Sequence, residues 1–182
     1  MTDKHRRFLG PVVEMRKLHD SAEQRIVHSA EMLDRKSLAS VGDTTGERLT
    51  ALLTETKAHT PEELAANVAR IGELLGRFAL YVPARFTDDP AEQAKYWAVR
   101  SGIFPAVGGS RPAGTTCLSE DVAFHIEDLP RATAELQALI ARHGYDACIY
   151  GHALEGNYHF IINQSFSCLL YTSPSPRDRQ KS

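Results

Sequence analysis

The sequence has little of what marks secreted or membrane-spanning proteins. Its three cysteines, Cys117, Cys148 and Cys168, are too few and too widely spaced for a disulfide framework or a Cys-x-x-Cys metal motif. A reducing, cytoplasmic compartment is therefore the expected location. No run of about 18 apolar residues occurs, and residues 1–7 are polar with no apolar run after them. The sequence thus predicts neither a membrane span nor a signal peptide.

Neither sign of charge dominates the sequence. There are 21 Lys and Arg residues against 23 Asp and Glu residues, which gives a formal net charge of −2. This balance excludes the strongly basic surface that binds nucleic acid or an anionic membrane. With 42% hydrophobic residues in 182, the chain can bury a substantial core. We therefore expect a globular domain whose partner is a small molecule.

Helical and strand-like patterns alternate along the chain. Charged, helix-favouring sequence extends to about residue 40, with a helical pattern over residues 29–38. Capping signals at Thr60 and Asp89, each followed by proline, predict helices over residues 60–76 and 90–102. A third helix should end at Gly144. The predicted strands cover residues 49–56, 78–82 and 119–126 and a C-terminal hairpin, and residues 104–114 form a Gly/Pro-rich connection. This order favours an α+β fold, a ferredoxin-like antiparallel sheet with helices packed on one face.

Composition divides the chain into three parts. Residues 1–45 are expected to be a helical linker or remnant, and residues 46–166 the main domain. Residues 167–182 are rich in Ser and Pro and predict a disordered tail. This tail resembles translated adapter sequence, which would make it foreign and the natural chain cut near residue 166; a native tail is the alternative.

Two histidines in the C-terminal hairpin are candidate metal ligands. If residues 154–157 form a four-residue loop, His152 and His159 become opposed partners on one sheet face, with Cβ atoms roughly 5 Å apart. Such a pair suits one divalent ion, although zinc usually takes at least three protein ligands. Two ordinary histidines near a strand end are the alternative. Alternation puts Tyr150 on the same face as the pair, and Ile149 and Phe160 on the other.

Residues from about 29 to 166 resemble the C-terminal, substrate-side domain of FAD-linked 2-hydroxyacid dehydrogenases and oxidases. This family includes D-lactate dehydrogenase, the glycolate oxidase flavoprotein subunit and D-2-hydroxyglutarate dehydrogenase. Four stretches carry the resemblance, residues 30–38, 96–108, 120–124 and 151–159. It implies a domain that covers the flavin held by a separate FAD-binding domain.

The resemblance also implies roles for individual residues. His152 and His159 match positions that bind a divalent metal such as Zn, Mn or Fe, and Asn157 matches a position near flavin and substrate. Arg100 matches the arginine that pairs with the substrate carboxylate, a task suited to a planar guanidinium. A solvated helix charge is the alternative for Arg100. We expect both imidazoles to be partly exposed on one sheet face, with Arg100 opening onto the same surface.

Two parts of the family pattern have no counterpart in the sequence. The Glu-His-Gly segment, which supplies a third metal ligand and the general base, would lie beyond residue 166. Nothing before residue 29 resembles an FAD pyrophosphate loop. We therefore expect a parent flavoenzyme that oxidises a D-2-hydroxyacid of the D-lactate type, and a fragment that is inactive alone. A stand-alone ferredoxin-like module that binds a metal or ligand without catalysis is the alternative.

Overall fold

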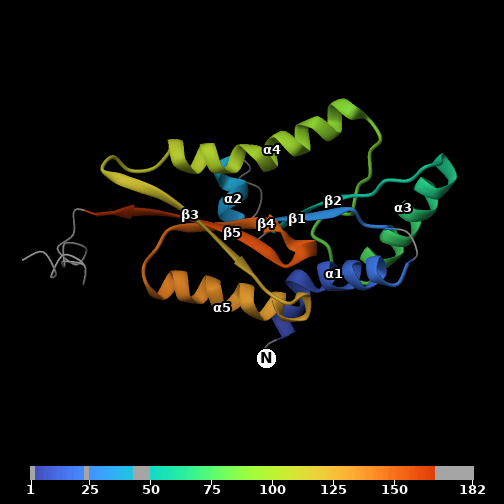
Figure 1. Cartoon of the computed structure of the whole chain (residues 1–182), viewed down its shortest axis with the longest axis horizontal. Coiled ribbons are helices and arrows are strands. Elements are labelled where there is room, and N and C mark those ends of the chain that lie inside the picture. The colour runs from blue at the N-terminus through green and yellow to red at the C-terminus, as the bar shows by residue number, and fades with distance from the viewer. Residues whose placement is uncertain (1–2, 23–24, 43–49, 167–182) are drawn as a thin grey trace, which may run out of the picture.

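The computed structural model describes residues 3–22, 25–42 and 50–166. In these residues five strands form one antiparallel sheet in the order β2-β1-β4-β5-β3 (Figure 1). The strands are β1 Ser29–Leu33, β2 Ala51–Glu55, β3 Thr115–Ala123, β4 Ala147–His152 and β5 Asn157–Ser165. The predicted strand at residues 49–56 and the predicted terminal hairpin are confirmed as β2 and as β4 with β5.

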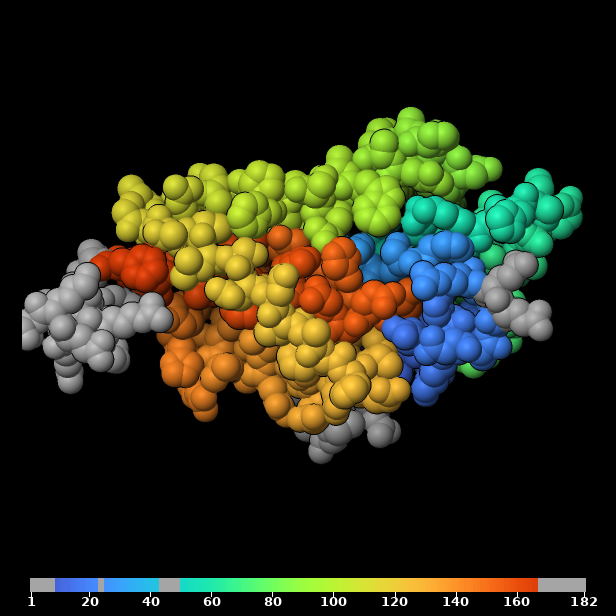
Figure 2. All heavy atoms as spheres, viewed as in Figure 1, coloured from blue at the N-terminus to red at the C-terminus, as the bar shows by residue number. Residues whose placement is uncertain are grey.

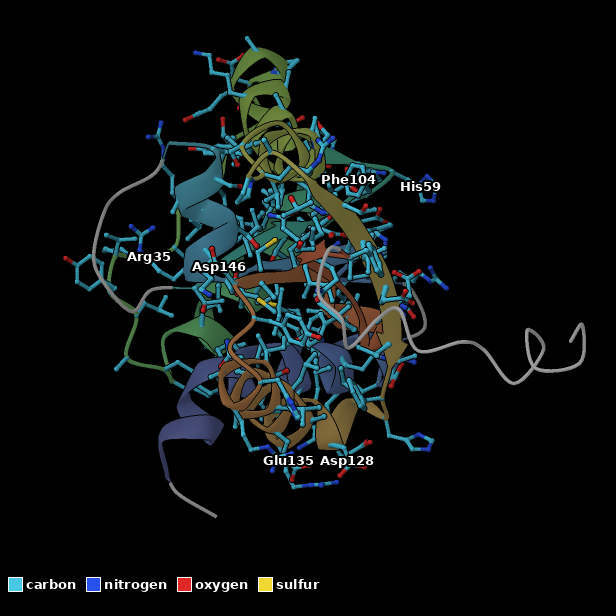
Figure 3. The ribbon with its side chains drawn as sticks, turned by 90° about the vertical axis from the view of Figure 1, so that its left-hand side faces the viewer. Arg35, His59, Phe104, Asp128, Glu135 and Asp146 are labelled. Atoms are coloured by element: carbon cyan, nitrogen blue, oxygen red, sulfur yellow. The ribbon has the colours of Figure 1, made fainter. Side chains whose placement is uncertain are left out.

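Helices lie on both faces of this sheet. They are α1 Asp3–Asp20, α2 Arg35–Ser40, α3 Pro61–Leu75, α4 Pro90–Gly109 and α5 Leu129–Arg142, with short 3-10 turns η1 Ile126–Asp128 and η2 Ala153–Glu155. Figure 1 shows α4 on one side of the sheet and α1 with α5 on the other. The labelled side chains in Figure 3 mark the two layers of helices. Phe104 of α4 lies far from Glu135 of α5 and from Asp128, which directly precedes α5.

The predicted α+β class is confirmed. The expectation that helices pack on one face of the sheet only was wrong. The two strands β4 and β5 carry apolar side chains on both faces, so each face needs cover. One core packs Ile149 and Tyr158 against Leu9 of α1 and Leu129 of α5. On the other face, Leu33, Cys148, Tyr150 and Ile161 of the sheet pack with Leu38 of α2 and Ile103 of α4.

The predicted helix starts are confirmed at atomic detail. The Thr60 hydroxyl accepts a hydrogen bond from the Glu63 N–H, and the Asp89 carboxylate accepts one from the Ala91 N–H. Proline follows each cap, where its missing N–H costs no helical hydrogen bond. The third predicted helix ends as expected, because Gly144 adopts a left-handed φ of 70° just after α5.

The predicted helix over residues 29–38 was wrong in its first half. Residues 29–33 form β1, which pairs with β2 on one side and β4 on the other. Asp34 then caps α2, accepting hydrogen bonds from the Ser37 N–H and hydroxyl, and a further one from the Ile149 N–H. Burial raises the pKa of Asp34, while these hydrogen bonds act in the opposite direction.

The segment before residue 45 shares its sheet and core with the rest of the chain. Strand β1 is an interior strand, and Val12 and Met15 of α1 are fully buried. The expected boundary itself falls in residues 43–49, outside the described residues. The expected tail, residues 167–182, also lies outside them.

Two further local expectations differ from the structure. Residues 78–82 form no strand; Tyr81 and Val82 are exposed and pair with no neighbour in the sheet. Helix α4 continues through Pro105 to Gly109, where a loop was expected. Proline removes one helical hydrogen bond, but Ile103 and Val107 on either side of it pack on the sheet and hold the helix in place.

No helix in the described part of the chain is long and apolar enough to cross a membrane.

Candidate functional site

The hairpin that carries the two histidines has a wider turn than the sequence suggested. Tyr150, not His152, is the cross-strand partner of His159. The turn η2 buries Ala153 and Leu154 in the core, and this displaces the register by two residues. Because the displacement is even, each side chain keeps its predicted face.

The two imidazoles nevertheless lie side by side. Their ring centroids are 5.3 Å apart in an edge-to-face arrangement, and Tyr150 lies 5.4 Å from His159 on the other side. The side chain of His152 is 51% exposed and that of His159 is 23% exposed. The structure thus brings the predicted pair together, with both rings accessible from one sheet face.

A buried carboxylate joins His152 to Arg100. Glu31 of β1 lies opposite His152 in the register, and its side chain is only 4% exposed. One of its oxygens lies 2.5 Å from His152 Nδ1, and the other accepts a hydrogen bond of 2.7 Å from Arg100 Nε. The three side chains come from β1, α4 and β4 and form one continuous network.

His159 has a carboxylate partner of its own. Asp121 lies directly opposite it on β3, and the Asp121 carboxylate forms a hydrogen bond with His159 Nδ1. An ionised carboxylate can only accept hydrogen bonds, so Nδ1 of each histidine carries the proton. In the neutral form of each ring, the Nε2 lone pair is then available to a ligand.

Arg100 lies at the junction of this network and an open hollow. Its guanidinium carbon is 4.8 Å from the centroid of the Tyr150 ring, a cation–π distance. The hollow has a volume of about 560 Å³ and is lined by Arg100, Ser119, Glu120, Asp121, Tyr150 and His159. Burial raises the pKa of Tyr150, so the ring is a neutral phenol at neutral pH. A larger hollow of about 990 Å³ lies beside α5, and no predicted site residue lines it.

Asn157 begins β5, opposite Ala123, two residues before His159. Alternation therefore puts it on the same face as His159. Its carbonyl oxygen lies close to Gly151, where an added Cβ would approach it to 3.0 Å.

Within the residues that the structure describes, no group of three His, Cys, Asp or Glu side chains is arranged to hold a metal ion.

The sequence names Arg100 and both histidines as candidates but indicates no role for Glu31, Asp121 or Tyr150. Glu31 is the one charged residue in the strand Ser-Ala-Glu-Met-Leu, and a lone charge in a buried strand is a signal of a paired group. Its partners could not be named, because they lie 69 and 121 residues away and their positions depend on helix packing and strand pairing.

Fold and site together define an α+β domain with an open hollow whose lining includes one arginine, one imidazole, one phenol and two carboxylates. The family of FAD linked oxidases, C-terminal domain, matches residues 15–168, and the chain belongs to this family. It is the substrate-side domain of a flavin-dependent oxidoreductase, with FAD as cofactor and an FAD-binding domain as partner. No curated protein sequence gave a match.

Proposed function

We propose that the parent enzyme oxidises a D-2-hydroxyacid of the D-lactate type to the 2-oxoacid. The C–H bond at C2 breaks, its hydride passes to FAD, and the hydroxyl proton leaves to a base. The observation that supports this proposal is that Arg100 and His159 line one hollow, with the second imidazole, His152, beside His159. A 2-hydroxyacid carries a carboxylate and a hydroxyl on adjacent carbons, so both must be recognised within a few ångströms.

Arg100 is the group suited to the carboxylate. Its Nε already donates to Glu31, which fixes the plane of the guanidinium. The two terminal nitrogens carry four further N–H donors. A planar pair of donors binds a carboxylate through two parallel hydrogen bonds, which sets the orientation of the substrate as well as its position.

The histidine pair fits a divalent cation of the Zn, Mn or Fe class as part of a ligand set. In both rings Nδ1 is engaged by a carboxylate, the arrangement that orients imidazole ligands in metal sites. His152 and His159 would contribute their Nε2 atoms. A bound metal would act as a Lewis acid toward the substrate hydroxyl. The described residues supply neither the third ligand nor the general base, and Asn157 is the residue we assign to the flavin side.

The test uses the FAD-loaded parent enzyme under anaerobic conditions. D-lactate and longer D-2-hydroxyacids should bleach the flavin absorbance, and L-lactate should not. Arg100→Lys, which keeps the charge but loses the planar fork, should raise KM about tenfold or more. Arg131→Lys is the matched control, because Arg131 is an exposed arginine on α5 that pairs with Asp128 and Glu135. Failure of every D-2-hydroxyacid to reduce the flavin would overturn the proposal.

A further inference from the structure

The carboxylate of Glu31 occupies an unusual place in the site. It is almost completely buried and contacts two of the residues to which function was assigned, one through each oxygen. A buried ionised group is costly unless all its acceptor positions are used. Of its two partners, Arg100 lines the hollow, and His152 lies beside His159, which also lines it.

The two contacts determine where the protons lie. Arg100 is always charged and can only donate, so the oxygen it contacts is an acceptor. The positive charge of Arg100, 2.7 Å away, holds Glu31 as a carboxylate, so its other oxygen accepts from His152 as well. His152 must therefore carry its proton on Nδ1, with the Nε2 lone pair directed away from the buried side.

The same contacts determine geometry. A guanidinium held at Nε by Glu31 and stacked over Tyr150 has one plane available to it. The ring of His152 is held by the same carboxylate on the neighbouring strand. Moving either side chain without the other would break a charge-assisted hydrogen bond to a buried oxygen.

We infer that Glu31 is the positioning residue of this site: its single buried carboxylate sets the Nδ1–H tautomer of His152 and the plane of the Arg100 guanidinium together. Recognition of the substrate carboxylate and presentation of the imidazole are thereby linked through one group. Glu31 does not touch the substrate and acts through its two partners. This inference rests on the proposed function, but it concerns the chain's own hydrogen bonds and can be tested without turnover.

The decisive variant is Glu31→Gln, which keeps the shape of the side chain. A glutamine amide presents one acceptor and one donor end, whereas Arg100 Nε and His152 Nδ1 both donate. Glutamine can therefore satisfy only one of them. Asp121→Asn is the matched control for the neighbouring histidine, and Glu55→Gln removes a carboxylate from the next strand, where Glu55 pairs with Lys57 instead.

The measurement is nitrogen NMR of the full chain at about pH 8.5, two units above the ordinary histidine pKa, where neutral tautomers are compared. Signals of His152 and Arg100 are assigned with His152→Gln and Arg100→Lys. The unchanged chain and Glu55→Gln should show His152 with its proton on Nδ1 and a slowly exchanging Arg100 Nε–H. Glu31→Gln should lose at least one of the two, and Asp121→Asn should alter His159 alone.

Should Glu31→Gln unfold the chain, the double variant Glu31→Leu with Arg100→Met removes both buried charges and leaves no acceptor at position 31, so that the His152 tautomer can be read without it. The inference is overturned if the His152 tautomer and the Arg100 Nε–H signal are both unchanged in Glu31→Gln, or if His152 stays on the Nδ1–H tautomer in the double variant. These outcomes are separate from the proposed function. An enzyme that oxidises no D-2-hydroxyacid could still show the predicted tautomer, and an enzyme that oxidises one could lack it.

Discussion

Three weakly acidic groups, the Cys148 thiol and the Tyr150 and Tyr158 phenols, are buried in their protonated forms. Burial raises the pKa of the Cys148 thiol from its ordinary value of 9.0 to about 11, and it also raises the pKa values of Tyr150 and Tyr158. In the unfolded chain these groups lose their protons at lower pH than in the folded chain. Below about pH 9 their contribution to stability is fully present, and it is lost as pH rises through the folded values.

We therefore expect the free energy of unfolding to fall steadily above about pH 9, by at most about 1.4 kcal/mol per pH unit for each group. Tyr158→Phe should make this fall less steep, since it removes one buried phenol and keeps the ring. Tyr81→Phe is the control, because that side chain is 70% exposed. Urea unfolding at several pH values measures the slopes, and equal slopes in the two variants would contradict the argument.

The residues of the site differ in how far the sequence could reveal them. Arg100, His152 and His159 could be found because their types and spacing resemble a family pattern. Glu31 could not be placed, because its role depends on the pairing of β1 with β4. Whether His159 faces His152 or Tyr150 depends in turn on how the turn between their strands packs.

Among the elements, capped helices were predictable and the hairpin register was not. A cap is local, since the Thr60 hydroxyl and the Glu63 N–H that donates to it are only three residues apart. The turn η2 depends on distant groups, because Leu154 packs with Ile71 and Val27 in one core. The same distinction explains β1, whose sequence looks helical and whose strand form depends on neighbours on both sides.

The hairpin turn depends on Gly156. Its φ is +72°, and a Cβ added there would come within 2.2 Å of the Phe124 carbonyl oxygen. Gly144 has a similar φ of +70° but open space around it. We expect Gly144→Ala to cost about 1 to 2 kcal/mol from the left-handed backbone alone, and Gly156→Ala about 3 kcal/mol or more, since a backbone atom must also move. Chemical denaturation compares the two, and similar losses would show that the clash at Gly156 relaxes freely.

At the scale of the whole molecule, large exposed apolar side chains are concentrated in one stretch of the chain. Eight of the ten large hydrophobic side chains that are exposed in the described residues lie between Leu80 and Phe104. Figure 2 shows α4 as a ridge along the top of the molecule. Ile103 of α4 faces the core, whereas Trp97 and Phe104, seven residues apart, share an uncovered side. A helix that is apolar on both sides is typical of one covered on both sides.

Neighbouring residues on α4 allow this surface to be tested. Phe104→Ser should lower the fluorescence of a bound hydrophobic dye and change the free energy of unfolding by less than about 0.5 kcal/mol, because the side chain is 47% exposed. Ile103→Ala should instead change stability and not dye binding, since that side chain is completely buried in the core between α4 and the sheet. It should cost about 2 to 5 kcal/mol and leave dye binding to the folded chain unchanged. Dye titration and urea unfolding of both variants give the two readouts. A stability loss at Phe104 comparable with that at Ile103 would show that its side chain is part of the core, and that α4 has no uncovered apolar side.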